Sequence, residues 1–585
     1  MKRRMSLALV LTLIMTSVLS MPFTFAEGEA TTTSTEMAAV ATEVIENRVD
    51  ILTFNDFHGN VAEDVRDWGK NIGMAKMVGY VNAHRTANPN TLVVSGGDNY
   101  QGTAMSNLTH GAPVTEMFKA LDLTASAVGN HEFDWGVELI EKWAQDGNFT
   151  YLASNIYDKT TQEPVEWAKP YMFEEKAGLK IAFIGLAHPD TATLTAKENV
   201  EDVDFKDAVE AAQIWVDFLK AGKAEEGTPD VIIALTHLDS KQDRDTQEIT
   251  GTAALVANNV EGVDAVVSAH SHKTVAGKVN GVPVVQAYKY GRSIGMLSIN
   301  LDDAGKVADI TASVDNVYKT KNDIIADPAS VAKIDAYEVE LGPILNEKLG
   351  VAGAEFSHEG DNVTVLGQWA TKVMAEAADV QIGLQNGGGL RRSMYAGDIT
   401  MGDMYEIMPY DNLMISFDLP GADLKKAVDH GILNPDIRDG SFYGLMVEYD
   451  PNAEFENRVV SVKLADGTEI EDDKLYSCVA NDFMFFGGDK YDFSNAENIV
   501  ETYVPIRDVF VNAIKDGGTL LPEPVKSMKV AAKPMNYTTY VVKADDMLWK
   551  IAKAYNTTFE KIAEMNNIDN PNMIFEGATL KVPAK

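Results

Sequence analysis

The sequence is almost without cysteine, because Cys478 is the only one in 585 residues. A single cysteine cannot form a disulfide within the chain, which excludes a fold held together by intrachain crosslinks. We therefore expect packed cores, together with bound metal ions, to hold the folded chain.

Positive charge is also scarce, since 50 Lys and Arg residues face 87 Asp and Glu residues and the net charge is −37. Such a surface repels polyanions, so we expect neither nucleic-acid polymers nor anionic lipid surfaces as partners of the whole molecule. Small phosphorylated molecules remain possible binding partners where local cations attract them. The 45% hydrophobic residues are typical of globular proteins, and the length predicts several domains of roughly 150 residues each.

Long hydrophobic runs are missing after the first 26 residues, so we expect no transmembrane segment. The one apolar run extends from Leu7 to Leu19, which is shorter than the roughly 20 residues that a spanning helix needs. It follows the cations of residues 2–4 and ends in small residues near Ala26. This pattern predicts a signal peptide over residues 1–26 and hence a secreted protein.

The rest of the chain divides by its periodicity. Residues 27–48 are rich in Thr, Ala and Glu and predict a flexible lead-in. Over residues 49–325, short β-branched runs alternate with helical patterns, which indicates an α/β domain. Residues 326–355 lack strand signals and are interpreted as a linker helix. A second α/β domain is predicted over residues 356–530, and a small third module over residues 538–584.

Metal-ligating side chains occur in five short motifs of the first domain, each placed where a predicted strand gives way to a loop. The motifs are residues 55–59 (NDFHG), 95–98 (SGGD), 129–134 (GNHEFD), 236–237 (TH) and 269–272 (AHSH). Because strand ends converge on one crevice of an α/β sheet, distant residues can share a site there. Imidazole, carboxylate and amide oxygen are the ligand types that a pair of divalent ions needs.

These motifs, in this order, resemble the calcineurin-like metallophosphoesterases, whose signature runs D-x-H, G-D, G-N-H, H and G-H-x-H. The resemblance implies a four-layer α/β/β/α domain and two divalent ions, for which zinc, manganese, iron and cobalt are all compatible. It assigns one ion to Asp56, His58 and His272, the other to Asn130, His237 and His270, and a bridging role to Asp98. Ala269 departs from the usual Gly, a change from one small residue to another.

The same resemblance implies a catalytic pair. His131 would stand over the phosphoryl group, and Asp134 would orient its ring and favour its protonated form. The spacing of three residues predicts a turn that brings both side chains together. The implied chemistry is in-line attack of an activated water on the terminal phosphorus, while His131 stabilises the developing charge.

Three motifs of the second domain, residues 386–391 (NGGGLR), 408–412 (MPYDN) and 481–489 (NDFMFFGGD), resemble the C-terminal domain of 5′-nucleotidases and UDP-sugar hydrolases. The resemblance implies that Tyr410 and Phe483 sandwich the base. The other substrate-binding residues that it implies are Asp489 for the ribose, with Asn386, Arg391 and Asn412 as polar contacts.

This second domain departs from the family at three places. Residues 357–367 contain no Arg, although the family commonly has a phosphate-binding Arg there. Tyr410 stands where Phe is usual, and Lys490 where Gly is usual. The base preference and the affinity for a second phosphate are therefore open.

Residues 538–584 resemble a LysM domain, a small βααβ unit that binds peptidoglycan and other glycans containing N-acetylglucosamine. The matching features are a strand over residues 540–542, a helix over 550–555, the pair Asn566 and Asn567, and a strand over 580–583. Asp545 replaces the usual Gly before the first helix. The resemblance implies noncovalent association with the cell wall.

Together these patterns predict an exported dimetal 5′-nucleotidase that hydrolyses nucleoside 5′-phosphates and is anchored to the wall by LysM. One alternative is a 2′,3′-cyclic-nucleotide phosphodiesterase or UDP-sugar hydrolase of the same architecture. Another is a wall-bound nucleotide-binding protein that has lost catalysis.

Overall fold

The structure is a computed structural model that describes residues 47–65, 69–360, 362–531, 537–544, 546–566, 568, 570–571 and 573–583. The predicted signal peptide and all but the last two residues of the predicted lead-in lie outside the described residues. No helix in these described ranges combines the length and the apolar character needed to cross a membrane.

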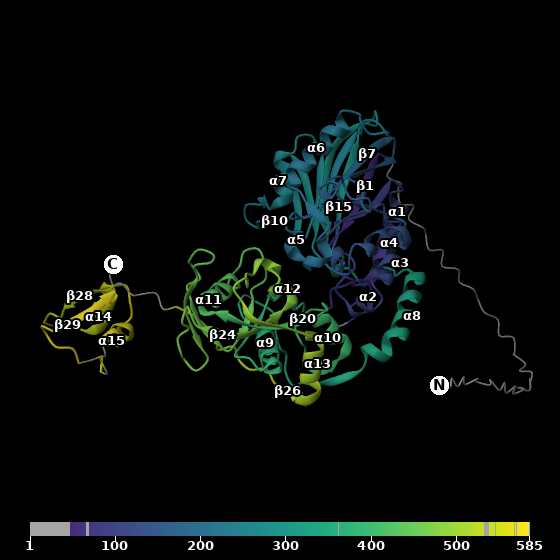
Figure 1. The fold of residues 1–585 in the computed structure, drawn as a ribbon. Coiled ribbons are helices and arrows are strands. Elements are labelled where there is room, and N and C mark those ends of the chain that lie inside the picture. Colours follow the sequence, from purple (N-terminus) through teal and green to yellow (C-terminus); the bar gives the residue numbers. More distant parts are fainter. Residues whose placement is uncertain are drawn as a thin grey trace, which may run out of the picture. The chain divides into compact units, whose positions relative to one another are not determined.

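Two six-stranded sheets form the centre of the first domain (Figure 1). The first sheet has the order β16-β15-β1-β2-β3-β4, with β1 (Arg48–Phe54), β2 (Thr91–Ser95), β3 (Ala125–Ala127), β4 (Thr150–Leu152), β15 (Ile294–Leu301) and β16 (Val307–Asp315). The second has the order β13-β14-β12-β9-β7-β6, with β6 (Tyr171–Lys176), β7 (Leu179–Leu186), β9 (Val231–Asp239), β12 (Ala265–Ala269), β13 (Thr274–Val279) and β14 (Val282–Ala287). The pairs β1–β2, β7–β9 and β9–β12 are parallel, so their carboxyl ends lie at the same edge of each sheet.

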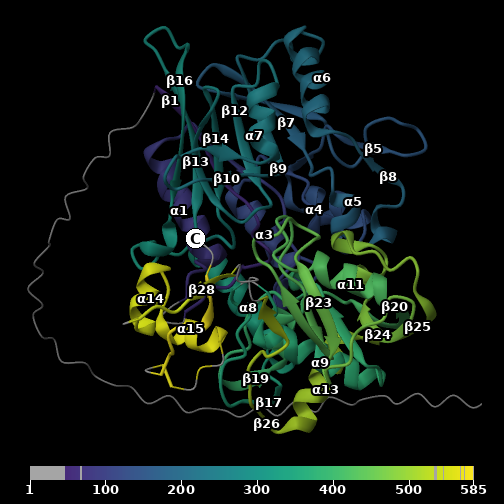
Figure 2. The ribbon, with the colours of Figure 1, turned by 90° about the vertical axis from the view of Figure 1, so that its left-hand side faces the viewer.

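Side-chain alternation explains why these sheets stack. In β1, Ile51 packs into the core between the two sheets, whereas Leu52 packs into the core under the helices of the outer layer. In β7, Phe183 lies between the sheets, and Ile184 faces the opposite helical layer. Both faces of these central strands are therefore buried, which confirms the predicted four-layer α/β/β/α arrangement (Figure 2).

The helices of the two outer layers complete this domain. One layer contains α1 (Gly73–Ala87), α3 (Ala112–Leu121) and α4 (Glu138–Gly147), and the other contains α6 (Ala208–Lys220) and α7 (Thr252–Asn259). Shorter elements lie in the connections: α2 (Ala104–Leu108), η1 (His131–Phe133), β5 (Ile156–Asp158), α5 (Thr191–Leu194), η2 (Lys197–Val200), β8 (Val203–Phe205), β10 (Lys241–Gln242), β11 (Ile249–Thr250) and η3 (Val317–Lys319).

The region that the sequence predicts as a linker helix contains a helix and a strand. Helix α8 (Pro328–Leu345) begins after Asp327, whose side chain accepts a hydrogen bond from the backbone N–H of Ser330 at 2.8 Å. Strand β17 (Lys348–Ala352) follows directly. Leu349 of this strand is buried in a core of the second domain.

The second domain has a mixed five-stranded sheet of order β21-β18-β24-β20-β25. Its strands are β18 (Ile382–Gln385), β20 (Leu413–Pro420), β21 (Ser441–Tyr443), β24 (Leu475–Asn481) and β25 (Glu497–Pro505). In β24, Cys478 and Val479 point into two different cores, so this sheet is covered on both faces. The helices are α9 (Val365–Ala378), η4 (Gly387–Gly389), α10 (Met401–Ile407), α11 (Gly421–His430), α12 (Asp482–Phe485), η5 (Gly488–Lys490) and α13 (Ile506–Gly517).

Two three-stranded sheets border that domain. One joins β17 to β19 (Gly397–Thr400) and β26 (Thr519–Leu520). The other joins β22 (Leu445–Tyr449) to β23 (Val459–Leu464) and β27 (Met528–Val530).

The last module has the predicted βααβ order. Strands β28 (Tyr537–Val541) and β29 (Thr579–Pro583) pair antiparallel, with α14 (Leu548–Ala554) and α15 (Phe559–Met565) between them. Asn566 joins α15 to β29, because its side chain donates to the carbonyl of Lys581 at 2.8 Å and accepts from the same residue's N–H at 2.7 Å. Asp545 and Asn567 lie outside the described residues.

Candidate dimetal centre and substrate cavity

All seven predicted metal ligands meet at the carboxyl ends of β1, β2, β3, β9 and β12. In the first group, His272 Nε2 lies 3.3 Å from His58 Nε2 and 3.3 Å from Asp56 Oδ1. Two unprotonated imidazoles and a carboxylate at this separation are suited to share one cation. Asp56 Oδ1 is buried and has no hydrogen-bond partner among the described residues, as expected for an atom that takes a metal ion.

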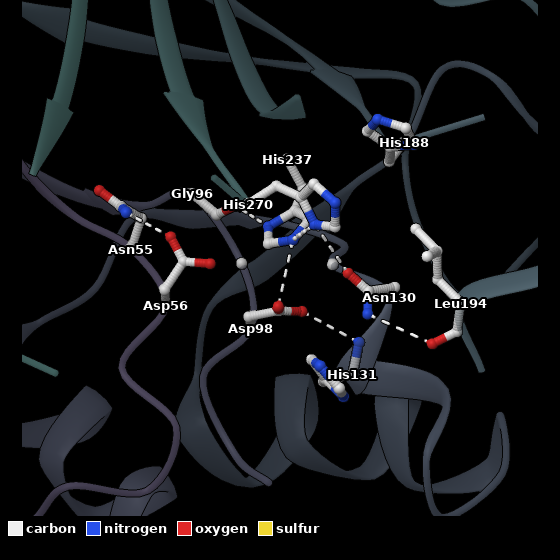
Figure 3. Close-up of polar contacts among 12 residues, drawn as sticks. Asn55, Asp56, Gly96, Asp98, Asn130, His131, His188, Leu194, His237 and His270 are labelled. Carbon is white, nitrogen blue, oxygen red and sulfur yellow. Dashed lines mark hydrogen bonds and ion pairs between the residues drawn. The ribbon is translucent and has the colours of Figure 1, made fainter. Parts of the chain in front are cut away.

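The second group lies beside Asp56 of the first group (Figure 3). His237 Nε2 is 3.2 Å from Asp98 Oδ2 and 3.3 Å from His270 Nδ1. Asn130 Oδ1 lies 3.1 Å from His270 Nδ1. Asp98 Oδ2 is also 3.8 Å from His58 Nε2 of the first group, so this carboxylate stands between the two groups. The residues present therefore fit a pair of divalent ions with one shared carboxylate.

Hydrogen bonds set the orientation of two of the rings. His58 Nδ1 lies 2.9 Å from the carbonyl of Gln101, and His237 Nδ1 lies 2.8 Å from the carbonyl of Gly96. A carbonyl can only accept, so Nδ1 carries the proton and Nε2 presents a lone pair to the cluster.

The backbone around the ligands is strained. Positive φ angles occur at five ligands, namely Asp56 (49°), His58 (48°), Asp98 (56°), His270 (64°) and His272 (53°). Side chains with a Cβ adopt this region rarely and at an energetic cost. The surrounding fold therefore holds these loops in a conformation that places the ligands.

Glu132 lies in the motif of residues 129–134, but no role for it was predicted from the sequence. Its fully buried carboxylate accepts hydrogen bonds from the backbone N–H groups of Asp98 (2.9 Å), Asn99 (2.9 Å) and Gly129 (2.7 Å). It thus ties the loop after β2 to the loop after β3. Burial, with the charge of Asp98, raises the pKa of Glu132 to about 7. Its position directly after His131 was the only sequence signal.

The predicted catalytic pair is also brought together. In the turn η1, His131 Nδ1 lies 2.8 Å from Asp134 Oδ2, and the backbone N–H of His131 donates to Asp98 Oδ1 at 2.9 Å. Burial lowers the pKa of His131, but the charges of Asp134 and Asp98 outweigh it, and the pKa lies above its ordinary value. Since Asp134 occupies Nδ1, Nε2 is the atom of this ring available to a substrate.

The six predicted substrate-binding residues all line one cavity of about 520 Å³, which is also lined by His131 and by four predicted metal ligands, Asp98, Asn130, His270 and His272. Within it, Asn386 Nδ2 donates to Asp489 Oδ2 at 2.7 Å. The ring of Tyr410 is stacked toward that of His131, with centroids 5.9 Å apart. Asn412 is different, because its amide donates to Asp482 Oδ1 at 2.9 Å and thus supports the loop.

Lys490, the departure next to Asp489, points away from this network. Its ammonium lies 2.8 Å from Asp190 Oδ2 in the first domain. Residues 357–367 contribute no cation to the cavity, in agreement with the sequence.

Comparisons with known proteins agree with this arrangement. The family model of the calcineurin-like phosphoesterase matches residues 49–274, that of the 5′-nucleotidase C-terminal domain matches residues 346–495, and that of the LysM domain matches residues 540–583. The 5′-nucleotidase precursor of Thermus thermophilus has the same fold, with a TM-score of 0.73, 23% identity, and coverage of 83% of this chain and 100% of that chain.

Three relatives match large parts of the chain. Endonuclease YhcR of Bacillus subtilis is 30% identical over 74% of this chain, but the chain spans only 37% of that protein. A 5′-nucleotidase of Vibrio cholerae is 28% identical over 76% of this chain and 86% of its own length. Cell wall protein Lmo0130 of Listeria monocytogenes is 25% identical over 80% of this chain and 67% of its own length.

Calcineurin-like phosphoesterases bind two divalent metal ions, and the two ligand groups described above fit such a pair. The chain therefore combines a calcineurin-like phosphoesterase domain, a 5′-nucleotidase C-terminal domain and a LysM domain, in that order.

Proposed function

We propose that the protein is a metal-dependent 5′-nucleotidase that hydrolyses nucleoside 5′-monophosphates to nucleoside and phosphate. The observation that carries this proposal is the shared cavity: members of both metal-ligand groups, two aromatic side chains suited to a base and the Asn386–Asp489 pair line the same space. Its volume of about 520 Å³ is in the range of small-molecule sites. The Vibrio relative and the C-terminal family model support the same activity.

The two ligand groups would each hold one divalent ion, with Asp98 shared between them. Such ions would supply Lewis-acid chemistry, namely the activation of water and the neutralisation of charge on the phosphoryl oxygens. Zinc, manganese, iron and cobalt all suit the mixed nitrogen and oxygen donors.

The side chains of the cavity account for the remaining steps. Protonated His131, oriented through Nδ1 by Asp134, donates from Nε2 to the charge that develops on the phosphoryl group or the leaving 5′ oxygen. Arg391 is close enough to His131 and His58 for its charge to act on both, so it is positioned to bind the same phosphate.

Tyr410 and Phe483 bind the base through their ring faces, and the carboxylate of Asp489 accepts from the ribose hydroxyls.

We further propose that the protein is exported and retained in the cell wall through its LysM domain. The LysM family model and the wall-protein relative from Listeria support this location. The ligand would be peptidoglycan or another glycan with N-acetylglucosamine units. Sedimentation of the protein with purified peptidoglycan, and its loss on competition with soluble chitin fragments, is the measurement that checks it.

The decisive experiment measures phosphate release from AMP, a cyclic nucleotide and a UDP-sugar by one preparation of the protein. Release from AMP that disappears after chelation, returns with metal and falls in His131→Ala would support the proposal. Turnover of the cyclic nucleotide or the UDP-sugar without AMP hydrolysis would replace it by the corresponding activity. No turnover with any metal, together with nucleotide binding, would favour a wall-bound binding protein.

A further inference from the structure

A second, larger cavity opens beside the nucleotide site. It has a volume of about 1720 Å³ and shares part of its lining with the smaller cavity. The shared lining includes the metal ligands His270 and His272, the ribose-side residue Asp489, and two cations, Lys289 and Arg438. The two cations therefore stand at the junction between the place of the hydrolysed phosphate and additional open space.

Neither cation is neutralised by a carboxylate. Among the residues that the structure describes, Lys289 and Arg438 have no ion-pair partner, although the chain has far more acids than bases. Lys289 Nζ lies 3.2 Å from His272 Nδ1 and 4.6 Å from the ring centroid of Tyr290. The acids that line the junction are Asp489, which accepts from Asn386, and Asp436, while Glu359 lies near Arg438.

The loop that carries Arg438 is held by two hydrogen bonds to the residue that follows it. The next residue, Asp439, accepts hydrogen bonds from the N–H groups of Asn434 at 3.1 Å and Asn362 at 2.7 Å. The side chain of Arg438 also lies across Gly387, where an added Cβ would come within 2.8 Å of Arg438 Cγ. Gly387 thus allows the arginine to reach the cavity over the glycine turn.

The hydrogen bond from Asn362 to Asp439 places the loop of Arg438 next to residues 357–367, the segment that lacks the expected phosphate-binding arginine. Electrostatics agree with this placement: burial lowers the pKa of His358 to about 4, and the charge of Arg438 contributes to that lowering. Arg438 itself is partly desolvated next to Arg391, and both effects lower its pKa. Glu359 partly offsets this lowering, but no carboxylate of the described residues lies within ion-pair distance of Arg438, and a bound anion would stabilise such a cation.

We propose that Arg438, assisted by Lys289, binds a second phosphate of the substrate, beyond the one that is hydrolysed. This inference rests on the proposed nucleotidase function and extends its substrate class from nucleoside 5′-monophosphates to nucleotides that carry a second phosphate group. Arg391, whose charge acts on His58, His131 and His272, remains with the hydrolysed phosphate. Arg438 lies instead over Gly387 and lines both cavities, so it is placed to bind a group that extends toward the larger cavity.

The second phosphate has two possible sources, which an experiment can separate. It belongs either to a 5′-diphosphate or to a phosphate on the ribose. We would measure binding to the full chain after chelation, when hydrolysis is blocked, by titration calorimetry with AMP, α,β-methylene-ADP and adenosine 3′,5′-bisphosphate. The variants are Arg438→Ala and Arg438→Lys, and the matched control is Arg85→Ala, which removes an arginine outside both cavities.

We expect the wild-type chain to bind at least one of the two-phosphate ligands more tightly than AMP. Arg438→Ala should weaken the binding of that ligand about tenfold or more and change the affinity for AMP by less than about twofold. Arg438→Lys should retain part of the difference, because it keeps the charge and loses the paired donors. Arg85→Ala should leave all three affinities unchanged.

If Arg438→Ala weakened the binding of AMP and of the two-phosphate ligands equally, the proposal would be overturned, since Arg438 would then bind the hydrolysed phosphate. Unchanged binding of all three ligands, or a wild-type chain without preference for a second phosphate, would also overturn it. A metal-loaded protein that binds these ligands but releases no phosphate from AMP would instead refute the proposed nucleotidase activity. The two failures are therefore distinguishable.

Discussion

The two halves of the substrate cavity differ in how their side chains are held. On the metal side, carbonyl oxygens orient His58 and His237, and the buried carboxylate of Glu132 joins two ligand loops. On the nucleotide side, Asn386 and Asp489 hold each other, but the guanidinium of Arg391 has no hydrogen-bond or ion-pair partner among the described side chains. The side chains on the metal side are held by hydrogen bonds within the protein, whereas no hydrogen bond among the described side chains holds the guanidinium of Arg391 on the nucleotide side.

This difference predicts how substitutions on each side behave. A change on the metal side should impair metal binding and therefore every substrate alike. A change on the nucleotide side should alter the affinity for particular substrates and leave the metal content intact. The predictions below test this separation, beginning with the largest expected effect.

Asp98→Ala should remove the carboxylate that stands between the two ligand groups. We expect phosphate release to fall at least about 10³-fold and the metal content measured by mass spectrometry to fall with it, because neither ion then has its shared ligand. Asp303→Ala, which changes an exposed acid in a distant turn, is the control. Full metal content together with normal turnover in Asp98→Ala would contradict the assignment.

Glu132→Gln should weaken metal binding by about 10- to 100-fold without unfolding the domain. An amide of the same shape offers one acceptor oxygen in place of two, so at least one N–H group of the ligand loops loses its partner. The variant is titrated with metal while activity and circular dichroism are recorded. Activity that recovers at high metal concentration would show a positioning role. An unaltered affinity for the metal would mean that the ligand loops keep their conformation without Glu132.

Tyr410→Ala should raise KM for AMP about tenfold or more through the loss of base stacking, while the metal content stays unchanged. Tyr410→Phe keeps the ring and should remain within about twofold of the wild type. Steady-state kinetics with both variants would check this. If Tyr410→Ala lost metal instead, the two halves would be coupled and the proposed separation would be wrong.

Asp50→Asn should leave turnover almost unchanged and lower the free energy of unfolding by about 1–3 kcal/mol at pH 7. Asp50 lies near the start of β1, remote from the metal ligands at its end, and is bound by Arg48 (2.8 Å), Asn88 (2.8 Å), Ser298 (2.7 Å) and His84 (3.0 Å). Burial raises the pKa of Asp50, but these hydrogen bonds outweigh it and hold the pKa well below its ordinary value.

The sign of the pH dependence follows from that lowered pKa. Near pH 4 the unfolded chain binds a proton at Asp50 that the folded chain does not, so this stabilisation is complete above about pH 5 and is lost as the pH falls toward the folded pKa. Chemical denaturation at several pH values gives the free energy of unfolding as a function of pH. Below pH 5 this free energy should fall less steeply with decreasing pH in Asp50→Asn than in the wild type. An unchanged slope would mean that other carboxylates dominate the acid range.

Much of the architecture was predictable from the sequence because the relevant signals are local. Alternating β-branched runs and helical patterns predicted the α/β domains, and the small βααβ module was recognisable from its strand and helix order. The linker region was less predictable: strand β17 begins three residues after α8 ends, and it pairs with β19 and β26, which lie far away in the chain. Periodicity within a short segment carries no information about such partners.

The sequence by itself determined which side chains are available as ligands, since the Asp, Asn and His residues of the five motifs occur in an order that resembles a known family. Only the tertiary structure decided how they are used. It placed Asp98 between two groups of ligands, gave Glu132 the task of joining two loops, and brought Arg438 to a segment that has no arginine of its own. The physical reason is that residue type fixes the chemistry of a group, whereas distance and burial, which determine its partners and its pKa, arise when separate strand ends and loops converge.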